Sequence, residues 1–399
     1  MADRAVPQDV DVVVVGAGPA GLLTAHLLRR QGLRAVVLER SSREHVEARV
    51  RAGLLELGTV EALRKAGLAG RLDAEALVHD GLEFRVDGVS HRLAFGELTG
   101  TPVFMYGQQL VVRDLLAAAD ADEAEVRFEA TDVQLSGLTS PTPLVTATTP
   151  EGPVAFRCRA VAGCDGYHGV SRRAAPAGVF REFVREHPYA WFGALAHTPP
   201  VSEELVYTIS ERGFALLSMR SRSVSRVYLQ VPRGTRPQDV PDEQLWSELQ
   251  QRLGGGTALT PGPVLERVLV DLRSVVVEPM QYGRLFLAGD AAHIVPPSAA
   301  KGLNMAVEDA EALAEALVAD LRDGQPELLA TYSQRRLPGV WQAQAFSDLT
   351  TNLFHTPGGA DPHAAALADR LRRAALQRVL DSTTAARDFS EHYVGAARR

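Results

Sequence analysis

The apolar and polar positions at the start of the chain form a regular order of elements. Val10–Val15 is a largely β-branched run, which is typical of a strand buried on both faces. The glycine-rich segment Gly16–Gly21 follows, and the apolar residues from Leu22 to about Arg30 predict a helix. Arg34–Leu38 forms a second apolar run. This order predicts a strand–helix–strand unit with parallel strands.

The pattern changes further along the chain. Short strands are predicted within 126–162, and 82–95 alternates like a hairpin. From Trp191 to Gln230, strands alternate with turns and no long helix is predicted, which indicates a separate antiparallel sheet. The runs 268–277 and 285–288 are again strand-like. Helical spacing of apolar residues predicts helices over 54–66, 108–119, 306–321, 328–346 and 364–380.

The composition narrows the class of protein. The chain has 399 residues, of which 46% are hydrophobic and 23% charged, and this excludes wholesale disorder. That length predicts two or three domains, or one large α/β unit with an insertion. A net charge of −7 argues against a general nucleic-acid binder. Two cysteines, Cys158 and Cys164, exclude a disulfide scaffold, and no residues have the spacing of metal ligands.

Two further absences in the sequence bear on location. No apolar run approaches the roughly 20 residues that a membrane span needs. The N-terminal segment also lacks the basic and then apolar layout of a secretory signal. We therefore expect a cytoplasmic protein whose partners include neither a membrane nor nucleic acid.

The first glycine-rich segment has the spacing of a dinucleotide fingerprint. Gly16, Gly18 and Gly21 lie between a strand and a helix, where they allow a tight turn, close approach of a pyrophosphate and packing of the helix on the strand. The N-terminus of the helix would then face the phosphates. Glu39 ends the second strand, where a carboxylate can accept hydrogen bonds from ribose hydroxyls. These residues predict a bound dinucleotide without separating NAD from FAD.

A second motif favours FAD. The strand-like run 285–288 ends in Gly289-Asp290, where a carboxylate can meet the ribityl hydroxyls of a flavin. Together with Arg49–Gly53, Tyr106–Gln108, Gly163–Gly166 and Lys301–Asn304, this segment resembles the class A FAD-dependent aromatic hydroxylases, and the likeness extends along nearly the whole chain. The resemblance implies that FAD is held by Gly16, Gly18, Gly21, Glu39, Arg49, Arg51, Gln108, Asp290, Leu303 and Asn304. Lys301 is expected to add positive potential beside the flavin.

The predicted sheet offers residues for a small aromatic acid. Ser218 and Arg220 lie two apart on a predicted strand and so face the same side. A short turn follows, and a hairpin would bring Tyr228 near them. An arginine fork and two hydroxyls suit a carboxylate. Tyr207 could then meet the other end of the molecule. All four residues match the benzoate pocket of the members that act on 4-hydroxybenzoate.

The same resemblance implies a proton relay and a coenzyme site. The relay would consist of Tyr207, Tyr393 and His79, because removing the proton of a phenol makes its ring a better nucleophile. The backbone carbonyl of Pro297 would contact the substrate hydroxyl. NADPH or NADH would bind at Arg51, His168 and Arg273. Mixed charges at Arg40, Arg43, Glu44 and His45 leave the choice of coenzyme open.

The resemblance implies an α/β fold with a Rossmann-like FAD-binding domain, an antiparallel-sheet substrate domain and a helical C-terminal region. We expect these at 1–178, 179–282 and 283–399, with 79–106 contributing to the substrate side. The implied reaction converts 4-hydroxybenzoate and O₂ to 3,4-dihydroxybenzoate through a flavin C4a-hydroperoxide, in a homodimer. Alternatives are another para-substituted benzoate such as 4-aminobenzoate, a flavin dehydrogenase or oxidase that inserts no oxygen, and a catalytically silent flavin-binding protein.

Overall fold

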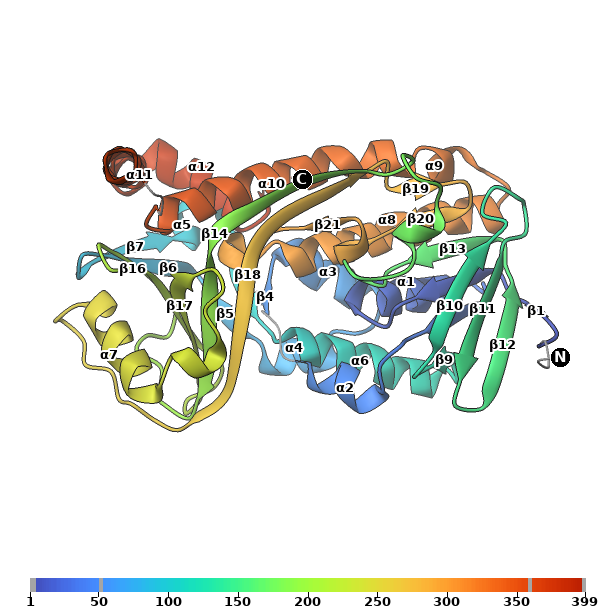
Figure 1. Ribbon diagram of the computed structural model, residues 1–399, viewed down its shortest axis with the longest axis horizontal. Helices are drawn as coiled ribbons and strands as arrows, with labels where there is room; N and C mark the ends of the chain where they lie inside the picture. The colour runs from blue at the N-terminus through green and yellow to red at the C-terminus, as the bar shows by residue number, and fades with distance from the viewer. Residues whose placement is uncertain (1–4, 50–52, 358–360, 397–399) are drawn as a thin grey trace.

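A six-stranded sheet forms the first layer of the fold, with strands from residues 12–163 and 281–287 (Figure 1). The computed structural model describes residues 5–49, 53–357 and 361–396. The strand order is β19-β20-β13-β2-β3-β9, and every neighbouring pair is parallel except β19 and β20. The strands are β2 (Val12–Val15), β3 (Ala35–Leu38), β9 (Val126–Arg127), β13 (Ala160–Gly163), β19 (Gln281–Tyr282) and β20 (Leu285–Leu287).

The central strand explains the apolar run of the sequence. All four valines of β2 are buried, because the strand lies between β3 and β13 and is covered on both faces. Helix α1 (Pro19–Arg30) packs against α6 (Gln108–Ala121) and α8 (Gly302–Leu321). The predicted strand–helix–strand unit is therefore present, with α1 as the connection between two parallel strands.

An eight-stranded sheet forms the second layer. Its order is β21-β18-β14-β17-β16-β15-β6-β7. Neighbours are antiparallel except β15 and β6, which are parallel, so the expected antiparallel sheet is in fact mixed. The bounds are β6 (Gly81–Val86), β7 (Val89–Ala94), β14 (Arg181–Ala196), β15 (Leu205–Ser210), β16 (Gly213–Met219), β17 (Ser225–Pro232), β18 (Val264–Glu278) and β21 (His293–Ile294).

Two long strands join the two layers. β14 and β18 pair antiparallel from Arg181 opposite Glu278 to Ala196 opposite Val264. In Figure 1 they run from the eight-stranded sheet toward β19 and β20, so they form the connection between the sheets. The predicted domain boundary at residue 178 precedes the first of them, and the division into domains stays a prediction.

Smaller elements surround the two sheets. Helix α7 lies against β15, β16 and β17. The predicted helix over 54–66 begins only at Leu57, because Leu54 and Leu55 pair with β8 as a short strand. The remaining elements are β1 (Gln8–Asp9), β4 (Leu54–Leu55), β5 (Leu77–His79), β8 (Val103–Met105), β10 (Thr131–Ser136), β11 (Leu144–Thr149), β12 (Gly152–Arg157), α2 (Arg43–Ala48), α3 (Leu57–Lys65), α4 (Gly70–Glu75), α5 (Phe95–Thr99) and α7 (Asp242–Leu253).

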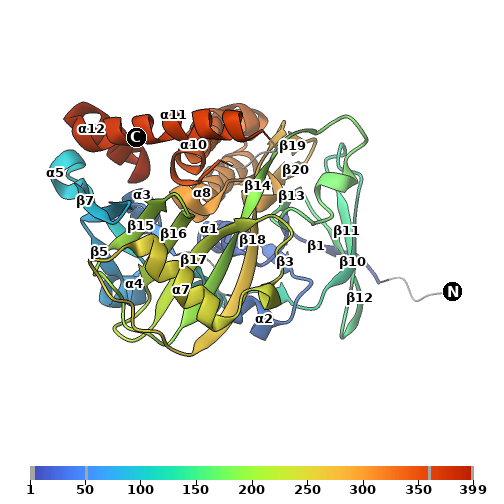
Figure 2. The same cartoon turned by 60° about the vertical axis from the view of Figure 1, so that its left-hand side comes forward.

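The C-terminal quarter is helical, as predicted. After α8 come α9 (Glu327–Ala330), α10 (Tyr332–Phe354), α11 (Pro362–Asp381) and α12 (Thr383–Tyr393). Figure 2 shows α10, α11 and α12 together above the sheets. Among the described residues, no helix is both long and apolar enough to cross a membrane.

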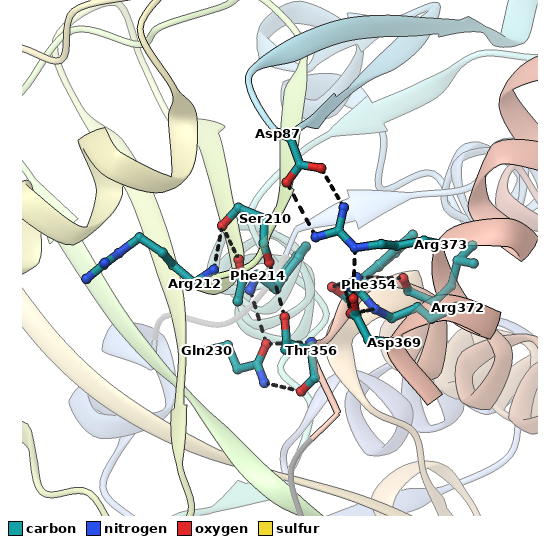
Figure 3. Close-up of polar contacts among 12 residues, drawn as sticks. Asp87, Ser210, Arg212, Phe214, Gln230, Phe354, Thr356, Asp369, Arg372 and Arg373 are labelled. Atoms are coloured by element: carbon teal, nitrogen blue, oxygen red, sulfur yellow. Dashed lines mark hydrogen bonds and ion pairs between the residues drawn. The ribbon is translucent and has the colours of Figure 1, made fainter. Parts of the chain in front are cut away.

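Hydrogen bonds fasten the end of α10 to the eight-stranded sheet (Figure 3). The Gln230 side chain donates to the Thr356 carbonyl at 2.9 Å and accepts from the Thr356 amide at 3.1 Å. Arg372 of α11 donates to the carbonyl of Phe354 at 3.4 Å. The Phe354 ring lies 5.1 Å from the ring of Tyr207, so these bonds hold an aromatic support behind that tyrosine.

Candidate active site

The glycines of the first motif form an open cradle at the N-terminus of α1. Gly16 has a φ of +105°, and a Cβ on Gly21 would lie 2.0 Å from the Gly16 carbonyl oxygen, so both positions require glycine. A Cβ on Gly18 would meet nothing within 4 Å. No side chain caps the helix at Gly18. The amides of the first turn therefore face open space, which fits a pyrophosphate.

Glu39 lies beside this cradle. Its Oε2 accepts a hydrogen bond from the Ala17 amide at 2.8 Å, and its Oε1 accepts one from the Ser41 amide at 2.9 Å. Each carboxylate oxygen has a second lone-pair direction that can still accept from a ribose hydroxyl. The carboxylate is thus fixed in place next to the predicted phosphate site.

A buried ionic network supports the Gly289–Asp290 turn. Asp290 is exposed, and Gly289 before it has a φ of +61° and donates its amide to Asp309 Oδ2 at 2.9 Å. His293 Nε2 lies 2.6 Å from the same oxygen, and Arg336 donates to Oδ1 at 2.8 Å. Although burial alone would raise it, the charges of His293 and Arg336 hold the pKa of Asp309 at about 2.

Asp309 was not among the predicted site residues. A signal was present, because Met305 and Leu313 lie four residues before and after it and all three are buried on one face of α8. A carboxylate on an apolar helix face needs a partner. Its partners come from β21 and α10, which the sequence alone does not place there.

The other described residues predicted to hold FAD lie on α6, at the end of α2 and at the start of α8. Gln108 is the first residue of α6 and is half-buried, and Arg49 ends α2 at the surface. Arg51 lies outside the described residues. Leu303 is half-buried at the start of α8, and the buried amide of Asn304 is used within the protein, with its partners being the Glu56 amide, the Thr59 hydroxyl and the carbonyls of Leu54 and Ala300. The backbone of these two residues remains available to a flavin.

The predicted coenzyme residues lie around one aromatic ring. The guanidinium carbon of Arg273 is 4.2 Å from the centroid of the Tyr167 ring, and that of Arg172 is 4.7 Å from it. The exposed His168 packs edge-on at 5.0 Å. The fold thus brings His168 and Arg273 together around the Tyr167 ring, directly after the Gly163–Gly166 segment.

Strand register brings three of the predicted substrate residues to one face. Tyr207 is opposite Leu216, and Leu216 is opposite Tyr228. Ser218, two residues after Leu216, faces the same side. The three predicted residues on this face, Tyr207, Ser218 and Tyr228, are all buried.

Arg220 directly follows β16, and its amide donates to the Val224 carbonyl at 2.9 Å in the hairpin turn. In the described part of the chain, its guanidinium forms neither an ion pair nor a hydrogen bond. Burial and the charge of Arg226 lower the pKa of Arg220, while Tyr228 raises it. A desolvated cation that lacks a carboxylate is a suitable site for an anion.

Two hydroxyls meet at the opposite end of this face. Tyr207 Oη and Tyr393 Oη are 2.9 Å apart, and Tyr207 also donates to the Ser298 carbonyl at 3.3 Å. Burial raises the pKa of Tyr207 to about 12, against a lowering by its bond to Tyr393. Burial likewise raises the pKa of Tyr393 well above its ordinary value. Both groups therefore stay protonated near neutral pH and can pass a proton as a hydroxyl pair.

Pro297 directly precedes Ser298, and the third predicted relay residue, His79, lies on β5. His79 on β5 is buried, and neither of its ring nitrogens has a hydrogen-bond partner among the described residues. The Pro297 carbonyl accepts from the Ala300 amide at 3.0 Å, which leaves its second lone pair for a ligand. The carbonyl that contacts Tyr207 is that of Ser298. The Ser298 hydroxyl lies 2.6 Å from that of Thr351 in α10.

The charge of Lys301 is compensated within the protein, which differs from our expectation. Its ammonium group is buried and donates to Glu56 Oε1 at 2.7 Å and to the carbonyls of His392 and Tyr393 at 2.5 and 2.9 Å. Since a carboxylate compensates its charge, Lys301 adds less positive potential than we expected. Its contacts instead anchor the end of α12, which carries the Tyr393 hydroxyl.

Comparison with known proteins decides the family. A family model described as an FAD binding domain matches residues 9–347. The chain is also 40% identical to the p-hydroxybenzoate hydroxylase of Acinetobacter baylyi, over 96% of this chain and 95% of that protein. The chain belongs to the FAD-dependent aromatic hydroxylases. It is a flavoprotein monooxygenase with FAD as cofactor and NAD(P)H as reductant.

More distant hydroxylases share the architecture. A 12-dehydrotetracycline 5-monooxygenase/anhydrotetracycline 6-monooxygenase of Streptomyces rimosus is 29% identical over 82% of this chain and 66% of its own length. The crystal structure of the p-nitrophenol 4-monooxygenase of Pseudomonas putida DLL-E4 superposes with a TM-score of 0.79 over 97% of this chain and 99% of that one, at 22% identity. The fold is therefore that of this monooxygenase family, which confirms the expected α/β class.

The buried network around Asp309 leads to a pH prediction. The pKa of Asp309 in the folded protein, about 2, is below that of an unfolded aspartate, so its stabilisation is complete above about pH 4 and is lost as the pH falls toward 2. We expect Asp309→Asn to lower the free energy of unfolding by about 2 kcal/mol at pH 7 and by about half as much at pH 3. Urea unfolding from pH 7 to 3 measures this difference.

Asp320→Asn is the matched control, because Asp320 lies on the same helix but pairs with Arg284 near the surface. Its effect should be smaller at every pH. A difference between Asp309→Asn and the natural protein that stayed constant down to pH 3 would show that Asp309 is not held ionised by its partners.

Proposed function

We propose that this hydroxylase converts 4-hydroxybenzoate to 3,4-dihydroxybenzoate, with consumption of NAD(P)H and O₂. The observation that carries the proposal is the pair of opposed polar ends on one buried face: the Arg220 cation without a carboxylate at one end and the Tyr207–Tyr393 hydroxyl pair at the other. A para-substituted aromatic acid has the complementary groups. The p-hydroxybenzoate hydroxylase of Acinetobacter baylyi, whose name gives the same substrate, supports the choice.

We assign to each residue of the site a role in substrate binding or in proton transfer. Arg220, Ser218 and Tyr228 bind the carboxylate of the substrate, which fixes its orientation. Tyr207 accepts a hydrogen bond from the substrate hydroxyl, and the Pro297 carbonyl contacts the same group. The Tyr393 hydroxyl then takes over the proton from Tyr207, and each tyrosine ends the transfer in its original protonation state.

The chemistry of oxygen insertion requires the proton to leave. When bound, reduced FAD supplies the activated oxygen. A phenolate pushes negative charge onto the ring carbon ortho to its oxygen, so that carbon is a better nucleophile toward the activated oxygen than in a phenol. The buried relay would allow ionisation while the aromatic cluster around Phe354 excludes bulk water from the ring. We propose Gly16, Gly18, Gly21, Glu39 and Asp290 as the residues that hold FAD.

Product analysis tests the proposed reaction. The flavin-loaded protein is incubated with NAD(P)H, ¹⁸O₂ and a panel of benzoates that carry a hydroxyl, amino or nitro group in the para position. We expect 4-hydroxybenzoate to accelerate NAD(P)H oxidation most and to gain one ¹⁸O atom at C3. Faster turnover of 4-aminobenzoate would assign a different substrate, and oxidation of NAD(P)H without ¹⁸O in any aromatic product would assign an oxidase.

The proposal also covers the assembly and its location. We propose a homodimer in the cytoplasm. The leucines Leu367 and Leu371, one turn apart on α11, are more than half exposed and offer an apolar contact surface for a second copy. Analytical ultracentrifugation measures the mass of the assembly in solution.

The carboxylate clamp yields the first functional prediction. Arg220→Ala removes the charge that pairs with the substrate, so binding of 4-hydroxybenzoate should weaken by about 2–4 kcal/mol. FAD content should not change. Arg222→Ala is the control, since Arg222 is exposed in the same hairpin turn. Equal affinities in both variants, measured by fluorescence titration, would place the carboxylate elsewhere.

The relay yields a second prediction. Tyr207→Phe keeps the clamp but removes the hydroxyl that accepts the phenolic proton. Bound 4-hydroxybenzoate should then stay neutral, and more NAD(P)H should be spent on H₂O₂ than on hydroxylated product. The absorption spectrum of bound substrate and the ratio of product to NAD(P)H measure both effects. Tyr189→Phe, a buried tyrosine of the same sheet, should behave as the natural protein. Normal ionisation in Tyr207→Phe would contradict the relay.

The choice of coenzyme is the third prediction. Arg43, which could attract the 2′-phosphate of NADPH, already donates to Glu47 at 2.8 Å and to Asp120 at 2.8 and 2.5 Å. Glu44 beside it is exposed and would repel that phosphate. We predict that both coenzymes work, with less than a roughly 100-fold preference in kcat/KM, which corresponds to about 2.7 kcal/mol. A larger preference for NADPH would contradict this account.

A further inference from the structure

Among the described residues, Glu204 is the charged group that acts on the buried His79. Its side chain is 1% exposed, and both ring nitrogens lack hydrogen-bond partners in the described part of the chain. Burial lowers the pKa of His79, and the Glu204 carboxylate opposes that effect. Val103, which faces His79 in the β5–β8 pair, is apolar. A group that must carry a proton is therefore placed in surroundings that disfavour its charged form, except on the side of Glu204.

Strand register explains why Glu204 lies beside the segment that carries His79. Leu205 of β15 pairs with Leu82 of β6 in parallel, so Glu204 is level with Gly81, two residues after His79. Arg92 of β7 passes over Gly81, since a Cβ on that glycine would lie 3.0 Å from Arg92 Nη2. Arg92 donates to both carboxylate oxygens of Glu204, at 2.8 and 2.7 Å. Three strands thus fix one carboxylate beside the segment that carries His79.

The exposed fraction of the side chain increases from His79 to Glu204 to Arg92. The side chain of Glu204 is 19% exposed and that of Arg92 is 49% exposed, whereas His79 is buried. The other charges near Arg92 are Glu97 and Asp80, and both are exposed. Glu204 is therefore the half-buried carboxylate between a buried imidazole and solvent.

We propose that Glu204, held by Arg92, is the last fixed group of the proton path, where it stabilises the protonated imidazole of His79 and passes its proton to water. In this step the N–H bond of the imidazolium breaks, an intervening water carries the proton to Glu204, where an O–H bond forms, and bulk water then takes the proton; no electron is transferred. Glu204 is a positioning residue, because it acts through His79. The inference rests on the role of His79 in the proposed function.

A titration of His79 tests the electrostatic part. The FAD-loaded protein is labelled with ¹³C at the histidine ring, and His79→Asn identifies the His79 signal in the NMR spectrum. In Glu204→Gln the pKa of His79 should fall by about one unit, because the carboxylate no longer stabilises the cation. In Arg92→Gln it should rise, because the remaining carboxylate is no longer offset by a guanidinium.

The decisive feature is that the two variants should shift the pKa of His79 in opposite directions. Both variants break the same ion pair, so a merely structural role would shift the two titrations in the same direction. Glu248→Gln is the control: Glu248 is 21% exposed and pairs with Arg212, which is 49% exposed, and also with Arg252. Shifts of the same sign, no shift, or an equal shift in Glu248→Gln would overturn the proposal.

A second measurement tests the proton path itself. After a rapid rise in pH, the ionisation of bound 4-hydroxybenzoate is followed by its absorption. Glu204→Gln should slow it by about tenfold or more while binding is unchanged. An unchanged rate would overturn the role of Glu204 in the proton path, even if the titrations shift as expected. If the natural protein does not ionise the bound substrate, both the proposed function and the proposed role of Glu204 in the proton path fail. The titrations would still report whether Glu204 controls the pKa of His79.

Discussion

The hydrogen bond between the Tyr207 and Tyr393 hydroxyls links parts of the chain that are 186 residues apart. Each hydroxyl is buried, so leaving either unpaired would cost free energy. The pair can form only if β15 is in register within its sheet and α12 is docked above it. Lys301 contributes to that docking, because it donates to the carbonyl of Tyr393 and to Glu56. The predicted site thus depends on the whole topology rather than on one segment.

Two desolvated cations of the site have different partners, and the difference indicates their roles. Lys301 is compensated by Glu56, so its charge is used within the protein. Arg220 has no such carboxylate, and burial lowers its pKa. A protein that leaves a desolvated guanidinium unpaired does so at a cost in stability, which a bound anion would offset. This contrast favours Arg220 over Lys301 as the group that selects an acidic substrate.

The sequence was sufficient for features that local spacing determines. The Gly16–Gly21 turn between a buried strand and a helix was predicted correctly, because glycine is required there by backbone geometry. The family and its FAD cofactor were also predicted correctly, because several motifs agreed along the chain. The expected hairpin partner of Ser218 follows from alternation along two strands. The assigned roles of these residues stay predictions.

Features created by contacts between distant segments could not be predicted. Leu54 and Leu55 were expected in a helix, but they pair with β8, and a two-residue strand has no pattern of its own. The parallel pairing of β15 with β6, which places Glu204 near His79, joins segments more than 100 residues apart. The partners of Asp309 likewise come from separate elements. In each case the residue type was visible in the sequence and its neighbours were not.

The absorption spectrum of 4-hydroxybenzoate bound to the flavin-loaded natural protein tests the central claim most directly. If Arg220 fixes the carboxylate and the tyrosine pair removes the proton, bound substrate must ionise at a lower pH than the free phenol. The account predicts a phenolate band that grows with a midpoint well below that of free 4-hydroxybenzoate in the same buffer. A midpoint equal to or above that of the free compound would show that the site does not stabilise the phenolate, and would contradict the account.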